Sequence, residues 1–178
     1  MAIPTKLLLS DLLKHNVRCD NGIDHGPVIS PWMHPPVHRI LGCVSRPSNL
    51  RLERKIWRLD QLKGIDKQEV YVKGLSSSTD QQTLDRFPTL MNANIFNRSG
   101  QPLGLIADFV FEPKNGNIQY YLVSRSNPLI PGTSRWRLSI SKISDKQPGS
   151  ISCDIDSLED LPIEKASLKE EFLIKSRK

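Results

Sequence analysis

The sequence is poor in cysteine and has no long hydrophobic run. Its 178 residues include three cysteines, Cys19, Cys43 and Cys153, whose spacing matches no zinc-ligand pattern. An odd number of cysteines without paired spacing favours reduced thiols over a disulfide framework. No stretch approaches the roughly 20 apolar residues of a transmembrane helix, and the leucine run at 7–9 is too short for the core of a signal peptide. We therefore expect an intracellular, cytoplasmic protein without a transmembrane segment.

The motifs of common catalytic sites are missing too. The sequence has no G-x-S-x-G nucleophile elbow and no G-x-x-x-x-G-K-[ST] phosphate loop. His34 and His38 are four residues apart, but the two prolines between them forbid the regular helix that would put both on one face. A zinc site that added His25 and Cys43 would lack the tight paired spacing of structural zinc. We predict that the protein is not an enzyme and holds no cofactor or metal.

The chain carries an excess of positive charge, most of it in its first part. The formal net charge is +6, and residues 1–73 contribute 12 basic and 7 acidic side chains. Such a basic body favours anionic partners, which include nucleic acid, an anionic membrane surface and an acidic protein. The alternative is that the charge serves solubility alone. Hydrophobic residues make up 38% and charged residues 25% of the chain, as in a globular protein.

A pattern in the chain occurs twice. The triplets Val-Ser-Arg at 44–46 and Trp-Arg-Leu at 57–59 recur at 123–125 and 136–138, both at an offset of 79 residues. Three further residues recur at an offset of 78, namely Asn16, Gly22 and Gly26 as Asn94, Gly100 and Gly104. We interpret this as an internal duplication. Residues shared by the copies then serve the fold, with Trp57 and Trp136 in the core, and function should be sought where the copies differ.

Each copy has the pattern of a small, closed β-sheet. Short apolar segments alternate with turn residues, and Asn115-Gly116 in copy two is a strong hairpin signal. Five or six short strands in about 60 residues are typical of a small barrel. Near the end, residues 157–161 could form one helical turn before Pro162, followed by a weakly amphipathic segment. We predict a first barrel at 1–73, a linker at 74–87, a second barrel at 88–153 and a C-terminal helical tail at 154–178.

The strand plan and its glycines resemble the PRC-barrel family. In copy two, residues 99–106 (Ser-Gly-Gln-Pro-Leu-Gly-Leu-Ile) are similar to that family's G-x-x-x-G-x-I/V core, and Gly116-Asn117-Ile118 to its following turn and strand. The counterpart in copy one is residues 21–28, although copy one lacks the Asn-Gly pair. The resemblance implies a mainly β fold of two tandem, small, antiparallel PRC-type β-barrels with a short C-terminal helix or tail.

The resemblance also implies a class of function. The chain is similar to tandem two-barrel proteins of cyanobacteria and plastids, and related domains occur in the photosynthetic reaction-centre H subunit and a ribosome maturation factor. This implies a non-catalytic, protein-binding adaptor or assembly factor for a large complex, with photosystem subunits as partners and a place in the cytoplasm or at the periphery of the thylakoid membrane. The alternative is an RNA- or ribosome-binding maturation factor. Few aromatic residues suited to base stacking are visible besides Trp32, which disfavours single-strand recognition.

Two features of copy one have no counterpart in copy two. Trp32-Met33-His34 precedes two prolines that would hold these side chains on a hairpin tip, a composition typical of an interface. The alternative is that Trp32 packs between the barrels. Basic residues are also dense from Arg39 to Arg58, either as a binding patch or as a solvated face. The candidate partner-binding residues are therefore Trp32, Met33, His34, Arg39, Arg46, Arg51 and Arg54.

Overall fold

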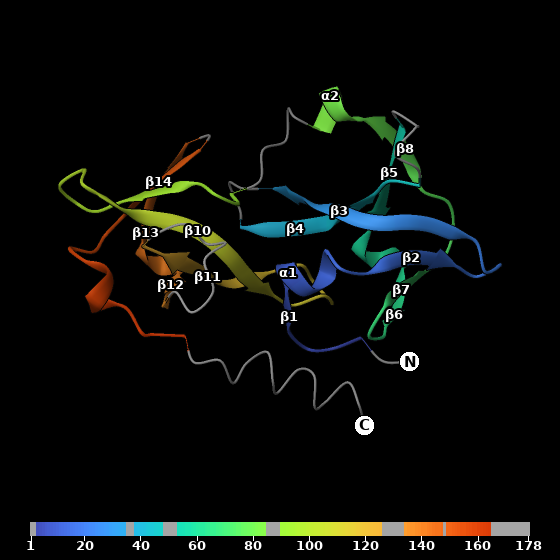
Figure 1. Cartoon of the computed structure of the whole chain (residues 1–178), viewed down its shortest axis with the longest axis horizontal. Helices are drawn as coiled ribbons and strands as arrows, with labels where there is room; N and C mark the ends of the chain where they lie inside the picture. Colours follow the sequence, from blue (N-terminus) through green and yellow to red (C-terminus); the bar gives the residue numbers. More distant parts are fainter. Residues whose placement is uncertain are drawn as a thin grey trace.

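The computed structural model shows a mainly β protein with two sheets that lie side by side (Figure 1). It describes residues 3–34, 38–47, 53–84, 90–125, 134–147 and 149–164, apart from the side chains of five of them (34, 81, 84, 146 and 147). The candidate residue Arg51, the two prolines after His34 and most of the predicted tail, 165–178, lie outside these ranges.

The first sheet has seven strands in the order β6-β7-β2-β3-β4-β5-β8. Neighbouring strands are antiparallel except β2 and β7, which are parallel. The strands are β2 (Asn16–Cys19), β3 (Asp24–His34), β4 (Arg39–Ser45), β5 (Glu53–Arg58), β6 (Leu62–Ile65), β7 (Glu69–Val72) and β8 (Ser77–Asp80).

The second sheet has the order β12-β11-β10-β9-β14-β13, with β1 also paired to β10. Its strands are β1 (Leu7–Leu8), β9 (Asn94–Phe96), β10 (Pro102–Phe111), β11 (Ile118–Ser124), β12 (Arg135–Ser139), β13 (Ile143–Gln147) and β14 (Ser150–Cys153). Short helices complete the described fold: α1 (Leu9–Leu12), α2 (Gln81–Leu84) and 3₁₀ turns at Leu59–Gln61, Ile140–Lys142 and Leu158–Asp160.

The two sheets share one strand topology. Matching β2 through β7 to β9 through β14 reproduces the order of the six strands, and the parallel pair β2–β7 recurs as β9–β14. Trp57 on β5 and Trp136 on β12 occupy corresponding strands, with exposed fractions of 1% and 8%. Their predicted burial is therefore confirmed, and the shared topology is what a duplicated module requires.

One long strand in each sheet divides its pairing between two neighbouring strands. The start of β3 pairs with β2 and its remainder pairs with β4, and β10 divides in the same way between β9 and β11. Where the long strand changes its pairing partner, the backbone at the end of the following strand passes very close to it. A Cβ atom on Gly26 would lie 2.1 Å from the carbonyl oxygen of Arg46, and one on Gly104 would lie 2.2 Å from that of Ser124. These recurring glycines therefore allow the close approach of two backbones.

The sheets do not follow the domain boundaries expected from the sequence. β1, from the segment predicted to form the first barrel, pairs with β10, where Leu7 is opposite Phe111. β8, from the predicted linker at 74–87, pairs with β5. The physical reason is the same in both cases, because an added strand satisfies backbone groups that an open strand edge would leave without partners. In the predicted tail, the described part contains a 3₁₀ turn at Leu158–Asp160.

The N-terminal segment is fixed to the second sheet by a buried carboxylate. Asp108 on β10 is 1% exposed, and its Oδ1 accepts a hydrogen bond from the backbone N–H of Ser10 at 3.1 Å. Burial raises the pKa of Asp108, an effect opposed by its hydrogen bonds from Ser10 and from the backbone N–H of Phe109, and by Arg135, whose Nη1 lies 4.0 Å from Oδ2. As Figure 1 shows, β1 and α1 consequently lie between the two sheets.

The β3–β4 hairpin joins the two sheets along a seam, which we define as His38 and Ile40 against Gly116, Ile118 and Tyr121. The N–H of Ile40 donates to the carbonyl oxygen of Gly116 at 2.8 Å, and the N–H of Ile118 donates to that of His38 at 3.1 Å. The His38 Nδ1 and the Tyr121 hydroxyl are 2.7 Å apart in a buried hydrogen bond. These contacts connect the sheets through both backbone and side chains.

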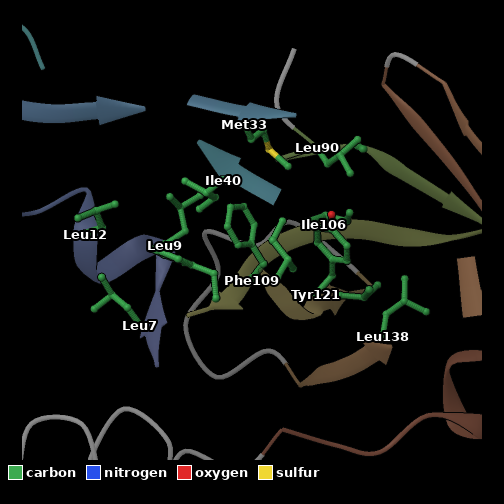
Figure 2. Packing of buried hydrophobic residues seen from close by; sticks show 14 of the residues in the cluster. Leu7, Leu9, Leu12, Met33, Ile40, Leu90, Ile106, Phe109, Tyr121 and Leu138 are labelled. Carbon is green, nitrogen blue, oxygen red and sulfur yellow. The ribbon is translucent and has the colours of Figure 1, made fainter. Parts of the chain in front are cut away.

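A single hydrophobic core crosses this seam. Met33 and Ile40 of the first sheet belong to the same buried cluster as Phe109 and Tyr121 of the second. Figure 2 shows Met33 and Ile40 directed toward β10, with the ring of Phe109 close to Ile40. The exposed fractions of Met33 and Ile40 are 2% and 0%. Much of the hydrophobic stabilisation is therefore shared by the two sheets.

The seam makes one glycine much less replaceable than another with the same backbone conformation. Gly116 and Gly100 have φ values of +79° and +78°, but a Cβ on Gly116 would lie 2.0 Å from the Ile40 carbonyl oxygen, whereas one on Gly100 meets nothing within 4 Å. We expect Gly100→Ala to cost about 1–2 kcal/mol of unfolding free energy through backbone strain. Gly116→Ala should cost about 1–3 kcal/mol more because it forces the sheets apart. Urea unfolding of both variants measures the difference, and equal losses would contradict the described packing.

Candidate functional site

A surface cavity of about 470 Å³ lies at one end of the first sheet. We call it the end groove. It is formed by the turn after β2, the start of β3, β5 and the segment that follows β7. Its lining residues are Cys19, Asp20, Asn21, Ile23, His25, Lys55, Trp57, Gly74, Leu75 and Ser76.

The turn after β2 forms one wall of the end groove. The N–H of Cys19 donates to the carbonyl oxygen of Ile23 at 3.1 Å, and the N–H of Gly22 donates to that of Cys19 at 2.9 Å. Gly22 has a φ of +80°, a left-handed conformation that few other residues adopt without strain. The turn is held by these bonds and leaves the Ile23 side chain 52% exposed.

Trp57 is fixed beneath the groove. Its Nε1 donates to Ser45 Oγ at 3.0 Å, and the residue is 1% exposed. The ring of His25 lies against it with the two ring centroids 4.8 Å apart and an interplanar angle of 59°. The aromatic pair therefore gives the groove a rigid base, whose accessible part is the half-buried His25 ring because Trp57 is covered.

A lysine and a histidine form the polar side of the end groove. Lys55 Nζ and His25 Nδ1 are 3.1 Å apart. Because an ammonium group only donates, His25 Nδ1 accepts this bond, which places the proton of the neutral ring on Nε2. Burial lowers the pKa of His25, as does the charge of Lys55, while Asp24 opposes the change. His25 is therefore neutral at pH 7, and the net charge of the pair resides on Lys55.

Leu75 is held in an exposed position beside the groove. Its side chain is 91% exposed. The buried amide of Gln61 donates through Nε2 to the carbonyl oxygens of Lys73 at 3.0 Å and Leu75 at 2.9 Å, which fixes the backbone on both sides of Gly74. Among the large hydrophobic residues that the structure describes, the exposed ones are Ile23, Leu75 and Ile163, so two of the three border this cavity.

The residues predicted at the hairpin tip have different environments. Met33 is 2% exposed, in the core that the two sheets share, and this burial argues against its predicted role in a binding surface. Trp32 is half-buried on β3, and the backbone of His34 ends that strand, although its side chain is outside the described atoms. The sequence offered packing between the barrels as an alternative for Trp32. In the structure its neighbour Met33 is the more deeply buried of the two.

The predicted arginines do not share one exposed face. Arg39 is exposed and its Nε donates to Asn117 Oδ1 at 3.3 Å, next to the seam. Arg46 is half-buried at the end of β4. Arg54 is 8% exposed on β5, and its Nη1 donates to the Glu53 carbonyl oxygen at 3.3 Å. Arg51 falls outside the described ranges. The binding patch therefore stays a prediction for Arg39 and Arg46, and burial argues against Arg54.

Three of the arginines that recur in both copies, Arg58, Arg125 and Arg137, pair with carboxylates or aromatic rings. Arg58 Nε lies 3.0 Å from Asp60 Oδ1. Arg125 pairs with Glu159, and its guanidinium carbon lies 5.2 Å from the centroid of Trp136. These contacts are consistent with a structural role for the duplicated arginines.

Sequence reasoning did not identify the end groove. Its signal lay in the differences between the copies, because His25 and Lys55 stand where copy two has Leu103 and Ser134. A position that carries a non-ionisable residue in one copy and an ionisable residue in the other marks a local change of environment. The exposure of Leu75, by contrast, depends on the hydrogen bonds of Gln61 and has no sequence signature.

The described residues hold no group of three histidine, cysteine, aspartate or glutamate side chains that could bind a metal ion. Burial raises the pKa of the Cys43 thiol to about 12 and that of Cys153 to about 11, so both are protonated at neutral pH. In the same part of the chain, no helix has the length and apolar character needed to cross a membrane.

Comparison with known proteins gives no family assignment. No protein-family model matches the chain, and no curated protein matches it.

The lowered pKa of His25 makes stability fall as the solution becomes acidic. An unfolded histidine titrates near pH 6.5. Because the folded pKa is lower, the unfolded state binds more protons as the pH falls below about 7, and the free energy of unfolding decreases. NMR titration of the His25 ring should give a midpoint below 6.5, and Lys55→Met should move it upward. A midpoint at or above 6.5 in the native protein would contradict the described environment.

Proposed function

We propose that this protein is a non-catalytic adaptor or assembly factor that binds a segment of another protein in the end groove. The observation that carries the proposal is the 91% exposure of Leu75, on a backbone fixed by Gln61, at the border of a cavity of about 470 Å³. A backbone that is already fixed loses little conformational entropy when the exposed apolar side chain that it carries is bound, which is a property of an interface anchor. Ile23, which is 52% exposed, extends the same apolar surface.

The broader assignment is also a proposal. Strand order, the recurring glycines and the hairpin at Gly116 support a pair of PRC-type barrels. The resemblance stated from the sequence then favours a large photosynthetic or thylakoid-associated assembly as the source of the partner. The alternative, RNA or ribosome binding, would depend on the net charge of +6 and on phosphate contacts.

Substitution of Leu75 tests the proposal. A tagged protein carrying Leu75→Glu should lose at least about tenfold in affinity for its partner, because one buried leucine contributes about 1.5–3 kcal/mol. Ile163→Glu is the matched control, since Ile163 is 60% exposed and lies on the second sheet away from the groove. Affinity isolation from native membranes and lysate, with and without nuclease, measures the loss.

The outcomes separate the two functions. Protein partners that survive nuclease, are lost with Leu75→Glu and are kept with Ile163→Glu would support the adaptor. Recovery that depends on nucleic acid and weakens steeply with salt would instead support RNA binding. Equal recovery with both variants would contradict a role for the end groove.

A further inference from the structure

The second sheet contains a counterpart of the end groove, which can be compared bond by bond. Its turn after β9 repeats the turn after β2: the N–H of Asn97 donates to the carbonyl oxygen of Gln101 at 2.9 Å, and the N–H of Gly100 donates to that of Asn97 at 3.0 Å. Gly100 has a φ of +78°, close to the +80° of Gly22. The same wall is therefore present at the corresponding end of both sheets.

In the second sheet this end is filled by the chain itself. Residues 154–161, which we call the plug segment, follow β14 and contain the 3₁₀ turn Leu158–Asp160. Its three apolar side chains are buried in the core, with exposed fractions of 4% for Ile155, 1% for Leu158 and 8% for Leu161. The plug segment thus acts as an internal ligand of its own sheet.

Polar contacts hold the plug segment in place. The N–H of Arg98 donates to the carbonyl oxygen of Ile155 at 3.1 Å, and Asn97 Nδ2 donates to that of Asp156 at 3.0 Å. Arg98 Nε lies 2.6 Å from Asp154 Oδ1, and Arg125 pairs with Glu159. An acidic segment with apolar residues is therefore recognised through backbone carbonyls, buried leucines and cationic side chains.

The first sheet lacks this plug because its connection is shorter. In the first sheet the chain leaves β7 and crosses to β5, where Ser78 pairs with Lys55. In the second sheet it leaves β14 and crosses to β12, where Ile163 pairs with Trp136. The crossing takes nine residues, 154–162, in the second sheet but only four, 73–76, in the first. Those four residues bring one large apolar side chain, Leu75, and it points to solvent. The cavity of about 470 Å³ borders this short crossing.

Residue differences between the copies adapt the end groove to an acidic ligand. Leu103, which packs against the core of the second sheet, corresponds to His25 in the first. Ser134 corresponds to Lys55, whose ammonium group is bonded to the neutral His25 ring. A neutral partner leaves the charge of Lys55 uncompensated, so a carboxylate that reached it would form a charge-assisted hydrogen bond.

We propose that the end groove binds a short acidic–apolar segment of a partner protein, in the way that the plug segment occupies the second sheet. An apolar side chain of that segment packs against Ile23 and Leu75 beside the His25 ring, and a carboxylate binds Lys55. This inference rests on the proposed function and specifies the chemistry of the partner. With so few anchors the affinity of an isolated peptide is weak, with a Kd on the order of 10–1000 µM.

The plug sequence itself supplies the probe. A synthetic peptide of residues 154–162, Asp-Ile-Asp-Ser-Leu-Glu-Asp-Leu-Pro, is titrated into the full-length protein and followed by amide NMR. We expect saturable shifts at Ile23, His25, Lys55 and Leu75. A peptide with serine at both leucine positions and a scrambled peptide of equal charge should each bind at least about tenfold more weakly.

Protein variants assign the contacts. Lys55→Gln should weaken the peptide about 5- to 20-fold by removing the charge, and the loss should shrink in high salt. Leu75→Glu should weaken it at least about tenfold, whereas Ile163→Glu should leave it unchanged. Shifts confined to residues 94–104 and 154–161 would overturn the inference, because they would show exchange with the plug of the second sheet.

Failure of this inference can be distinguished from failure of the proposed function. If the peptide does not bind but Leu75→Glu still abolishes capture of the protein partner, the adaptor proposal stands and the acidic segment is wrong. If neither experiment depends on Leu75, both are wrong. Binding of single-stranded RNA or anionic lipid vesicles at the same four residues, in place of the peptide, would also overturn the inference.

Discussion

The structure depends on the seam between its two sheets. A single sheet of this size buries too little apolar surface to be very stable alone. The β3–β4 hairpin solves this by placing Met33 and Ile40 in one core with Phe109 and Tyr121, while Ile40 and Ile118 exchange backbone hydrogen bonds with the opposite sheet. Because the hairpin is committed to the seam, the free surface of the first sheet lies elsewhere, at the end groove.

The parts of the fold that could be predicted were those whose residues recur in both copies of the sequence repeat. Trp57 and Trp136 recur because each packs in the core of a partly closed sheet, and Gly26 and Gly104 recur because a Cβ there would meet a backbone carbonyl. The internal repeat therefore revealed the strand plan without any comparison with other proteins. The exchange of β1 into the second sheet was not predictable, since a two-residue strand such as Leu7–Leu8 has no period of its own.

The candidate site, in contrast, could not be predicted from the sequence. The notable composition of Trp32-Met33-His34 suggested a binding tip, but an apolar tip serves a sheet-to-sheet contact as well as an external partner, and Met33 is in the core. The end groove arises from a difference in length, four crossing residues at 73–76 against nine at 154–162, and only a three-dimensional comparison of the copies reveals its effect. The proposed site thus lies where the duplicated modules differ, as the sequence had suggested, but at positions that the sequence did not single out for partner binding.

Native-state amide hydrogen exchange tests most directly whether the two sheets form one unit through the seam. The N–H groups of Ile40 and Ile118 donate across it at 2.8 and 3.1 Å. If the seam opens only when the whole protein unfolds, these two amides should show the same free energy of opening as amides in the middle of β4 and β11. Much faster exchange at Ile40 and Ile118 than at amides in the middle of β4 and β11 would show that the sheets separate easily, and would contradict the account.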